Sequence, residues 1–343
     1  MIEVGIIVNP ASGKDIRRII ANGTVVTNQE KINMVVRMIM AMDALCVDLV
    51  TILPDPTHIG QRVIDQVARH LVHCRVEILA MPRVIGTARD SLLGSEIMRQ
   101  RGVSCMLVLG GDGTSRVVAR NSGNVPLLPI STGTNNVFPR MVEGTLAGMA
   151  SAKIALGKVA RGQGCRQAPR LELLDDHDEL VDIALVDLAV IDARDLGSRA
   201  VLEYDTIREL FLTIASPSNI GLSSIGGWLC PLVSETDGER QALHIEMGPD
   251  GEITVLAPIA PGTMREVKVR RYARFGRVES IPVSSAPGVI ALDGEREVRM
   301  GKDGKFSVRL NPEGPIIVDL DRTLHHAASQ TWMDTGRSDD RVF

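Results

Sequence analysis

The stretch that most constrains this chain runs from Val103 to Arg116 and reads VSCMLVLGGDGTSR. Its apolar first half, which ends at Leu109, is typical of a buried parallel strand. The glycines that follow allow a sharp turn and let a ligand approach the backbone. Thr114 is expected to cap the next helix, whose free N–H groups would attract phosphate. The stretch therefore predicts a phosphate-handling loop with one acid, Asp112, placed to reach a metal ion or a hydroxyl proton.

The bulk composition indicates an ordinary globular protein. A length of 343 residues is enough for about two domains, and 44% of the residues are hydrophobic. The formal net charge of −4 argues against a nucleic-acid binder, which usually presents a basic face. Only nine aromatic residues are present (two Trp, two Tyr, five Phe), so platforms for base stacking are not expected.

The five cysteines are scattered, with no C-x-x-C pair. Together with an N-terminal MIEVGIIVNP that lacks a basic leader, this predicts reduced thiols and a cytoplasmic location. No apolar run approaches the roughly 18 residues that a membrane span needs, so no membrane partner is expected.

The first half of the chain alternates between strand and helix patterns. Strands are predicted at residues 3–8, 47–53, 75–80, 103–109 and 125–130. Helices are predicted at residues 28–42, 58–71, 86–101 and 141–157, with a short one after the glycine loop. This alternation predicts a mostly parallel sheet that helices cover on both faces.

Two further polar loops follow predicted strands of this sheet. The first runs from Asn9 to Lys14 and includes Ser12, and the second follows the strand at 125–130. Ligands of open α/β sheets bind at loops that follow strand C-termini, so both loops are candidate walls of the site. Simple Pro/Gly or polar turns are the alternative reading for each. The second loop contributes the candidates Thr132, Gly133, Thr134, Asn135 and Asn136.

From about residue 166 the pattern changes to short β-rich runs separated by turns. This spacing predicts a second, mainly β domain. A short helix is expected within it at residues 203–212, and the polar tail at residues 329–343 is expected to fray. The predicted organisation is an α/β domain at 1–140, a connecting helix at 141–165, a β-rich domain at 166–320 and a tail at 321–343.

Common cofactor motifs do not fit. Gly13-Lys14 lacks the upstream glycine and the following hydroxyl residue of a P-loop, and Arg116 occupies the third-glycine position of the dinucleotide fingerprint. His70 and His73 lie three residues apart, but no third zinc ligand is visible, so no metal-ligating set is predicted.

The motif Gly110-Gly111-Asp112-Gly113-Thr114 resembles the signature of the superfamily that joins ATP-NAD kinases, diacylglycerol kinases and 6-phosphofructokinases. Later segments are similar to the ATP-NAD kinases in particular: SPSN at 216–219, SSIGG at 223–227, APIAP at 257–261 and ALVD at 184–187. The segments NPASGKD at 9–15 and STGTNN at 131–136 most resemble the acetoin catabolism protein X branch of that family.

The resemblance implies an NAD-kinase-like fold, with an N-terminal three-layer α/β domain, a β-rich second domain and the active site in the cleft between them. It implies transfer of a phosphoryl group from ATP, or another phosphate donor, to the 2′-hydroxyl of NAD with Mg²⁺ present. Asp112 would accept the hydroxyl proton, a role that agrees with the needs of phosphoryl transfer. The implied binding residues are Asn9, Ser12, Gly110, Gly111, Gly113, Thr114, Thr134 and Asn135, with Asp187, Ser216 and Ser218 as acceptor contacts.

Val186-Asp187 replaces the Asn-Glu pair that the NAD kinases carry, and a valine side chain cannot make the hydrogen bonds of an amide. Two alternatives to an NAD kinase therefore stay open. One is a lipid or other small-alcohol kinase with the same loop. The other is a catalytically silent nucleotide sensor linked to acetoin catabolism. Nucleotide substrates and a homo-oligomeric state are expected as partners.

Overall fold

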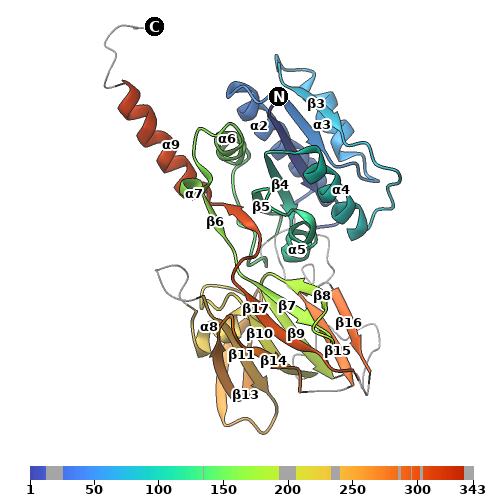
Figure 1. The fold of residues 1–343 in the computed structure, drawn as a ribbon, viewed down its shortest axis with the longest axis vertical. Coiled ribbons are helices and arrows are strands. Elements are labelled where there is room, and N and C mark those ends of the chain that lie inside the picture. The colour runs from blue at the N-terminus through green and yellow to red at the C-terminus, as the bar shows by residue number, and fades with distance from the viewer. Residues whose placement is uncertain are drawn as a thin grey trace.

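The structure, a computed structural model, describes residues 1–12, 26–133, 135–192, 206–232, 240–284, 287–294, 296–301 and 304–335. The predicted site residue Thr134, together with Gly13 and Lys14, lies outside them. Figure 1 shows an α/β lobe above a β-rich lobe, and helix α9 (Leu320–Thr335) extends away from the α/β lobe.

The α/β lobe contains a seven-stranded sheet that is parallel except at one edge. Its order is β3 (Arg75–Ile78), β2 (Leu49–Ile52), β1 (Glu3–Val8), β4 (Cys105–Gly110), β5 (Leu127–Ser131), β18 (Ile316–Val318) and β6 (Cys165–Gln167). Only β6 runs antiparallel, against β18. The chain builds β2 and β3 on one side of β1 and then places β4 on the other side. The strand order therefore reverses between β1 and β4, where ligands of such sheets bind.

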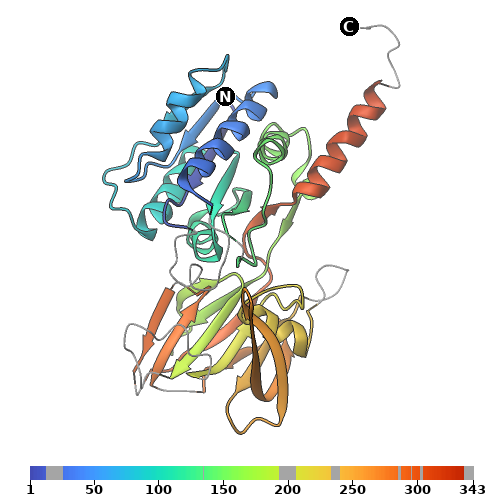
Figure 2. The same ribbon diagram turned by 180° about the vertical axis from the view of Figure 1, so that it is seen from behind.

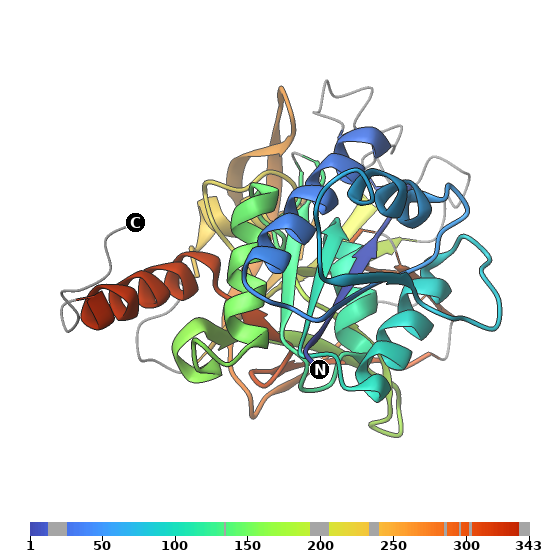
Figure 3. The same ribbon diagram turned by 90° about the horizontal axis from the view of Figure 1, so that it is seen from above.

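Helices cover both faces of this sheet, as Figure 3 shows from above. One face packs against α2 (Asn28–Ala44), α3 (Ile59–Val67) and α6 (Gly144–Ala155). The other packs against α4 (Ala88–Arg101) and α5 (Asp112–Asn121). The apolar stripe of α2 is wholly buried at Ile32, Val35 and Ile39, as its period of three to four residues predicts. The predicted three-layer α/β arrangement is confirmed.

The β-rich lobe consists of two antiparallel sheets packed face to face (Figure 2). The larger has the order β12 (Ile253–Ala260), β13 (Thr263–Phe275), β11 (Ala242–Met247), β10 (Ile207–Leu212), β9 (Asp187–Asp192), β15 (Gly288–Leu292) and β16 (Arg296–Met300). The smaller has the order β14 (Ser280–Pro282), β17 (Ser307–Asn311), β7 (Arg170–Leu174) and β8 (Leu180–Ala184). Helix α8 (Leu222–Leu229) covers the outer face of the larger sheet.

The short helix expected at 203–212 is wrong over the described part of that range. Residues 207–212 form β10, which pairs with β9 on one side and β11 on the other. Leu210 and Leu212 pack into one core and Phe211 into another, so the strand is buried on both faces and its hydrophobicity does not alternate. Helix α8 was not predicted.

The C-terminal end also differs from the expected frayed tail. Residues 320–335 form α9, which begins against α6 and the short helix α7 (Arg161–Gly164). Leu320, Leu324 and Ala327 form the stripe that packs against the first core. The neighbouring strands β18 and β6, from the segment assigned to the β-rich domain, pair with the first sheet.

Over the described parts of the chain, no helix combines the length and the hydrophobicity that crossing a membrane requires.

Gly148 marks a close approach of α6 to α2 and gives a test of this packing. A Cβ at Gly148 would overlap the backbone oxygen of Met38. We expect Gly148→Val to lower the free energy of unfolding by roughly 1–3 kcal/mol, the usual cost of overpacking. Chemical denaturation measures this. Gly162→Ala is the matched control, because nothing lies within 4 Å of an added Cβ there. Equal stability of both variants would contradict the packing.

Candidate functional site

Three loops meet where β1, β4 and β5 end, around the point at which the strand order reverses. The Nδ2 of Asn9, after β1, donates to the Oγ1 of Thr114 in the glycine loop at 2.8 Å. The Oγ1 of Thr132, after β5, donates to the Oγ of Ser12 at 2.8 Å. Four of the residues predicted from sequence are therefore joined by hydrogen bonds from loops up to 120 residues apart.

Lys31 lies beneath the loop after β1 and was not predicted as part of the site. Its side chain is fully buried, and its ammonium donates to the carbonyl oxygens of Asn9 and Ser12, each at 2.8 Å. A buried cation is costly unless it is hydrogen-bonded, so these bonds fix the loop to α2. The available signal was a lysine beside Ile32 on the inward face of an amphipathic helix.

The glycine loop turns directly into α5. Gly111 is the residue before the helix and Asp112 is its first residue, so the expectation that Thr114 caps the helix is wrong. Thr114 instead lies within the first turn and is 4% exposed. A Cβ at Gly110 would lie 2.5 Å from the Cβ of Thr114, so only glycine fits there.

Asp112 is held at the start of α5 by the loop that follows β5. Its Oδ1 accepts hydrogen bonds from the backbone N–H groups of Phe138 at 2.8 Å and Val137 at 3.1 Å. The side chain of Asn136 holds the same loop by donating to the Oγ of Ser131 at 2.7 Å. The predicted residues Gly133 and Asn135 belong to this turn. The carboxylate is thereby fixed in one orientation at the face toward the second lobe.

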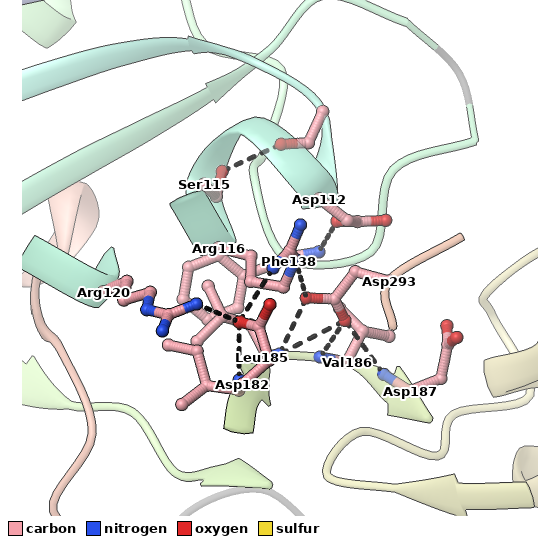
Figure 4. Close-up of polar contacts among 12 residues, drawn as sticks. Asp112, Ser115, Arg116, Arg120, Phe138, Asp182, Leu185, Val186, Asp187 and Asp293 are labelled. Atoms are coloured by element: carbon pink, nitrogen blue, oxygen red, sulfur yellow. Dashed lines mark hydrogen bonds and ion pairs between the residues drawn. The ribbon is translucent and has the colours of Figure 1, made fainter. Parts of the chain in front are cut away.

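Figure 4 shows two carboxyl groups of the β-rich lobe beside Asp112. Asp293 accepts backbone hydrogen bonds from Leu185 at 2.9 Å, Val186 at 2.8 Å and Asp187 at 3.1 Å. Burial raises the pKa of Asp293 above its ordinary value, although these N–H groups and Arg116 oppose the rise. Asp293 belongs to the site but was not among the site residues predicted from the sequence.

Asp187 is the acid that faces Asp112 from the other lobe. Burial raises the pKa of Asp187 well above its ordinary value, and the carboxylates of Asp293 and Asp112 raise it further. The carboxyl groups of Asp112, Asp187 and Asp293 are therefore close enough to interact electrostatically. A carboxyl group that keeps its proton can donate a hydrogen bond, which a carboxylate cannot.

Ser216 and Ser218 lie on the segment after β10, whose last residue, Leu212, pairs with Asp187. Their hydroxyl groups hydrogen-bond to each other at 2.8 Å. At the start of this segment the N–H of Thr213 donates to the carbonyl of Val186 at 3.0 Å, and further along the side chain of Asn219 donates to Ser223 of α8 at 2.9 Å. The structure therefore places the two serines at the same end of the sheet as Asp187.

A cavity of about 180 Å³ opens on the other side of the glycine loop. It is smaller than the roughly 300–1,000 Å³ of a pocket that encloses a whole ligand, but it adjoins Gly113 and Thr114. The remaining walls come from the loops after β1, β2 and β3 and from the start of α4. Among the residues that the structure describes, they include the acids Asp55 and Asp90, whose carboxylates accept backbone N–H groups, and no lysine or arginine.

The carboxylates also bear on whether Mg²⁺ fits. Among the described residues, no group of three or more His, Cys, Asp or Glu side chains could hold a metal ion. Mg²⁺ is usually bound by one or two carboxylates together with substrate phosphates. Asp112 at the glycine loop fits this arrangement, in which the protein supplies one carboxylate and the substrate supplies the remaining oxygen ligands.

The raised pKa of Asp187 leads to a prediction. Because the pKa is higher in the folded state, the stabilising contribution of this group is present at low pH and is lost as pH rises through that value. Asparagine stays neutral throughout. We expect the stability of Asp187→Asn, relative to the unsubstituted protein, to increase between about pH 5 and about pH 9 in urea unfolding. A difference that does not change with pH would contradict the assignment.

Comparison with known proteins adds three findings. Residues 4–159 match the family model of the ATP-NAD kinase N-terminal domain. Residues 169–313 match that of the acetoin catabolism protein X C-terminal domain. The chain is 36% identical over 335 residues to acetoin catabolism protein X of Cupriavidus necator. This alignment covers 94% of this chain and 92% of the relative.

Proposed function

Since the chain belongs to the family of acetoin catabolism protein X and has an ATP-NAD kinase N-terminal domain, we propose that it is a phosphotransferase. It transfers the terminal phosphoryl group of ATP, with Mg²⁺ bound to the donor, to the 2′-hydroxyl of NAD or a related nucleotide. The observation that carries this proposal is the placement of Asp112, whose carboxylate is fixed by two backbone N–H groups and faces the second lobe.

Asp112 has the position that an acceptor hydroxyl requires. Phosphoryl transfer depends on positioning and charge neutralisation, and a carboxylate orients the nucleophile and takes its proton. The bonds from Val137 and Phe138 keep the carboxylate from rotating, so that its orientation does not have to be organised during the reaction. The N-terminus of α5 at the same place favours the negative charge of phosphate.

The cavity beside Gly113 supports a nucleoside triphosphate as donor rather than inorganic polyphosphate. Polyphosphate is a polyanion and needs a basic channel, whereas the cavity walls formed by the described residues include Asp55 and Asp90 and no basic residue. A neutral base or ribose fits beside carboxylates and apolar surface. With the nucleoside in the cavity, its phosphates lie along the glycine loop toward Asp112.

On the acceptor side, Asp187 supports a ligand that offers hydrogen-bond acceptors. Its raised pKa favours the protonated carboxyl group, which can donate to a ribose or base atom. The backbone N–H of the neighbouring Val186 is not available to bind the acceptor, because it already donates to the carboxylate of Asp293. Ser216 and Ser218 are further acceptor contacts at this end of the sheet.

A catalytically silent nucleotide sensor is the second candidate. The observation in its favour is the acceptor side of the cleft, where Val186 contributes a buried apolar side chain and the amide-bearing residue of the NAD kinases is absent. Binding of NAD or ATP in calorimetry, with no turnover of any acceptor, would favour the sensor. Turnover of a lipid or another small alcohol, with none of NAD, would favour the kinase alternative. In either case we expect a cytoplasmic homo-oligomer.

Asp112→Ala tests the catalytic assignment. We expect NADP formation from NAD and ATP, followed by a coupled assay, to fall by about 10²–10⁴-fold, which is the usual contribution of a positioned base. Asp178→Asn, in the exposed turn at the far end of β8, is the control and keeps the activity. NADP made equally well by Asp112→Ala and the unsubstituted protein would rule out this role.

Ser91→Trp tests the donor cavity, since Ser91 lines it and a larger side chain fills it. We expect the KM for ATP to rise by at least about tenfold, because excluding the nucleoside removes more than ~1.4 kcal/mol of binding. Arg89→Trp, at an exposed position of the same helix that does not line the cavity, is the matched control. An unchanged KM in Ser91→Trp means that the nucleoside binds elsewhere.

A further inference from the structure

Arg116 lies one helical turn after Asp112 on α5, so the two side chains project from the same face of the helix. Arg116 is only 5% exposed, although it lies at the boundary between the two lobes. In sequence it appeared only as the residue that breaks the dinucleotide fingerprint. A buried guanidinium next to a candidate catalytic acid needs its own explanation.

The guanidinium reaches both sheets of the β-rich lobe. Its Nη1 bonds to the Oδ1 of Asp182, on β8 of the smaller sheet, at 3.1 Å. Its Nε lies 4.0 Å from the Oδ2 of Asp293, in the turn after β15 of the larger sheet. Arg120, a further turn along α5, also contacts the Oδ1 of Asp182 at 3.1 Å, but it is much more exposed. Arg116 is thus in contact with one sheet and close to the other (Figure 4).

The Nε of Arg116 is buried and has no hydrogen-bond partner among the residues that the structure describes. An N–H···O hydrogen bond is about 2.9 Å long, so a shift of about 1 Å between the lobes would complete one to Asp293. A buried donor without a partner is costly, which gives that small closing movement a driving force.

Asp293 carries this contact on to Asp187. Its carboxylate accepts the backbone N–H groups of residues 185–187, and its own N–H donates to the carbonyl of Asp187 at 3.0 Å. Asp112 and Arg116 share α5, the guanidinium of Arg116 lies beside Asp293, and Asp293 is hydrogen-bonded to the backbone of Asp187. These contacts link the two acids that face each other across the lobes.

We propose that Arg116 is a positioning residue, which sets the distance between Asp112 and Asp187 by binding α5 to Asp182 and Asp293. Stability alone does not explain a buried charge here, because well-packed apolar residues in place of a buried ion pair are often as stable or more so. An ion pair, however, fixes geometry as apolar contacts do not. The kinetic consequence rests on the proposed phosphotransferase activity.

Two substitutions of Arg116 and a matched control test this in the full-length protein. We expect Arg116→Met to lower kcat by up to about 100-fold with a small change in KM, as for a reacting group misplaced by about 1 Å. Arg116→Lys keeps the positive charge but lacks the planar guanidinium that contacts two partners at once, so its kcat should lie between those of Arg116→Met and the unsubstituted protein. Arg120→Met removes the contacts of a more exposed arginine to Asp182 and to the carbonyl of Val181, and should keep kcat within about threefold, as for a surface ion pair. Equal kcat losses in Arg116→Met and Arg120→Met overturn the proposal.

Hydrogen exchange supplies a readout that does not depend on activity. In Arg116→Met, the amides of Leu185, Val186 and Asp187 should exchange about tenfold faster than in Arg120→Met, the change expected when a hydrogen bond loses its net contribution. Should Arg116→Met fail to fold, Arg116→Lys carries the same test with a smaller increase. Exchange at the Arg120→Met rate overturns the positioning role. Faster exchange together with no turnover in the unsubstituted protein would reject the proposed activity and leave the positioning role standing.

Discussion

The hydrogen bonds from the Val137 and Phe138 backbone to Asp112 are the interaction on which the candidate site depends. They join the loop after β5 to the first residue of α5, so that the glycine loop and its neighbour form one unit. The reversal of strand order between β1 and β4 brings the loop after β1 to the same place. Asn9 and Ser12 then complete the set through their bonds to Thr114 and Thr132.

The β-rich lobe presents two acidic side chains to this unit, and ionising them close to Asp112 is unfavourable by itself. Asp187 and Asp293 are buried near Asp112, and burial raises the pKa of each above its ordinary value. Backbone N–H groups and Arg116 offset part of that rise at Asp293. Retaining three acids at one boundary makes sense when a ligand supplies hydroxyl groups and magnesium-bound phosphates. That combination of chemistry is common to the phosphotransferase and sensor readings.

Much of the α/β lobe was predictable because its signals are local. β4 was predicted at 103–109 from its continuous apolar run and is found at Cys105–Gly110, and α2 was predicted at 28–42 from its hydrophobic period and is found at Asn28–Ala44. β10 was misread because its partners are remote. Glu209 looks like a surface residue of a helix, yet it is 2% exposed and bonds to His244 on β11 and to Ser284.

The distinction between local signals and remote partners also separates the predicted site residues from those that were missed. Asn9, Asp112 and Thr132 follow strands directly, so the order of strands and loops was enough to group them. Lys31 contacts Asn9, which lies 22 positions away in the sequence, and Asp293 contacts residues more than 100 positions away. No local sequence pattern indicates such distant partners. Position after a strand could be predicted, and pairing across the sheets could not.

The most direct test of the account is a crystal structure of the protein with NAD and a non-hydrolysable ATP analogue. The account predicts the adenosine 2′-hydroxyl at about 3 Å from the carboxylate of Asp112, with the analogue's phosphates along the glycine loop. It also predicts that Asp187 contacts the acceptor. NAD bound away from Asp112, or a cleft in which neither nucleotide reaches the glycine loop, would contradict it.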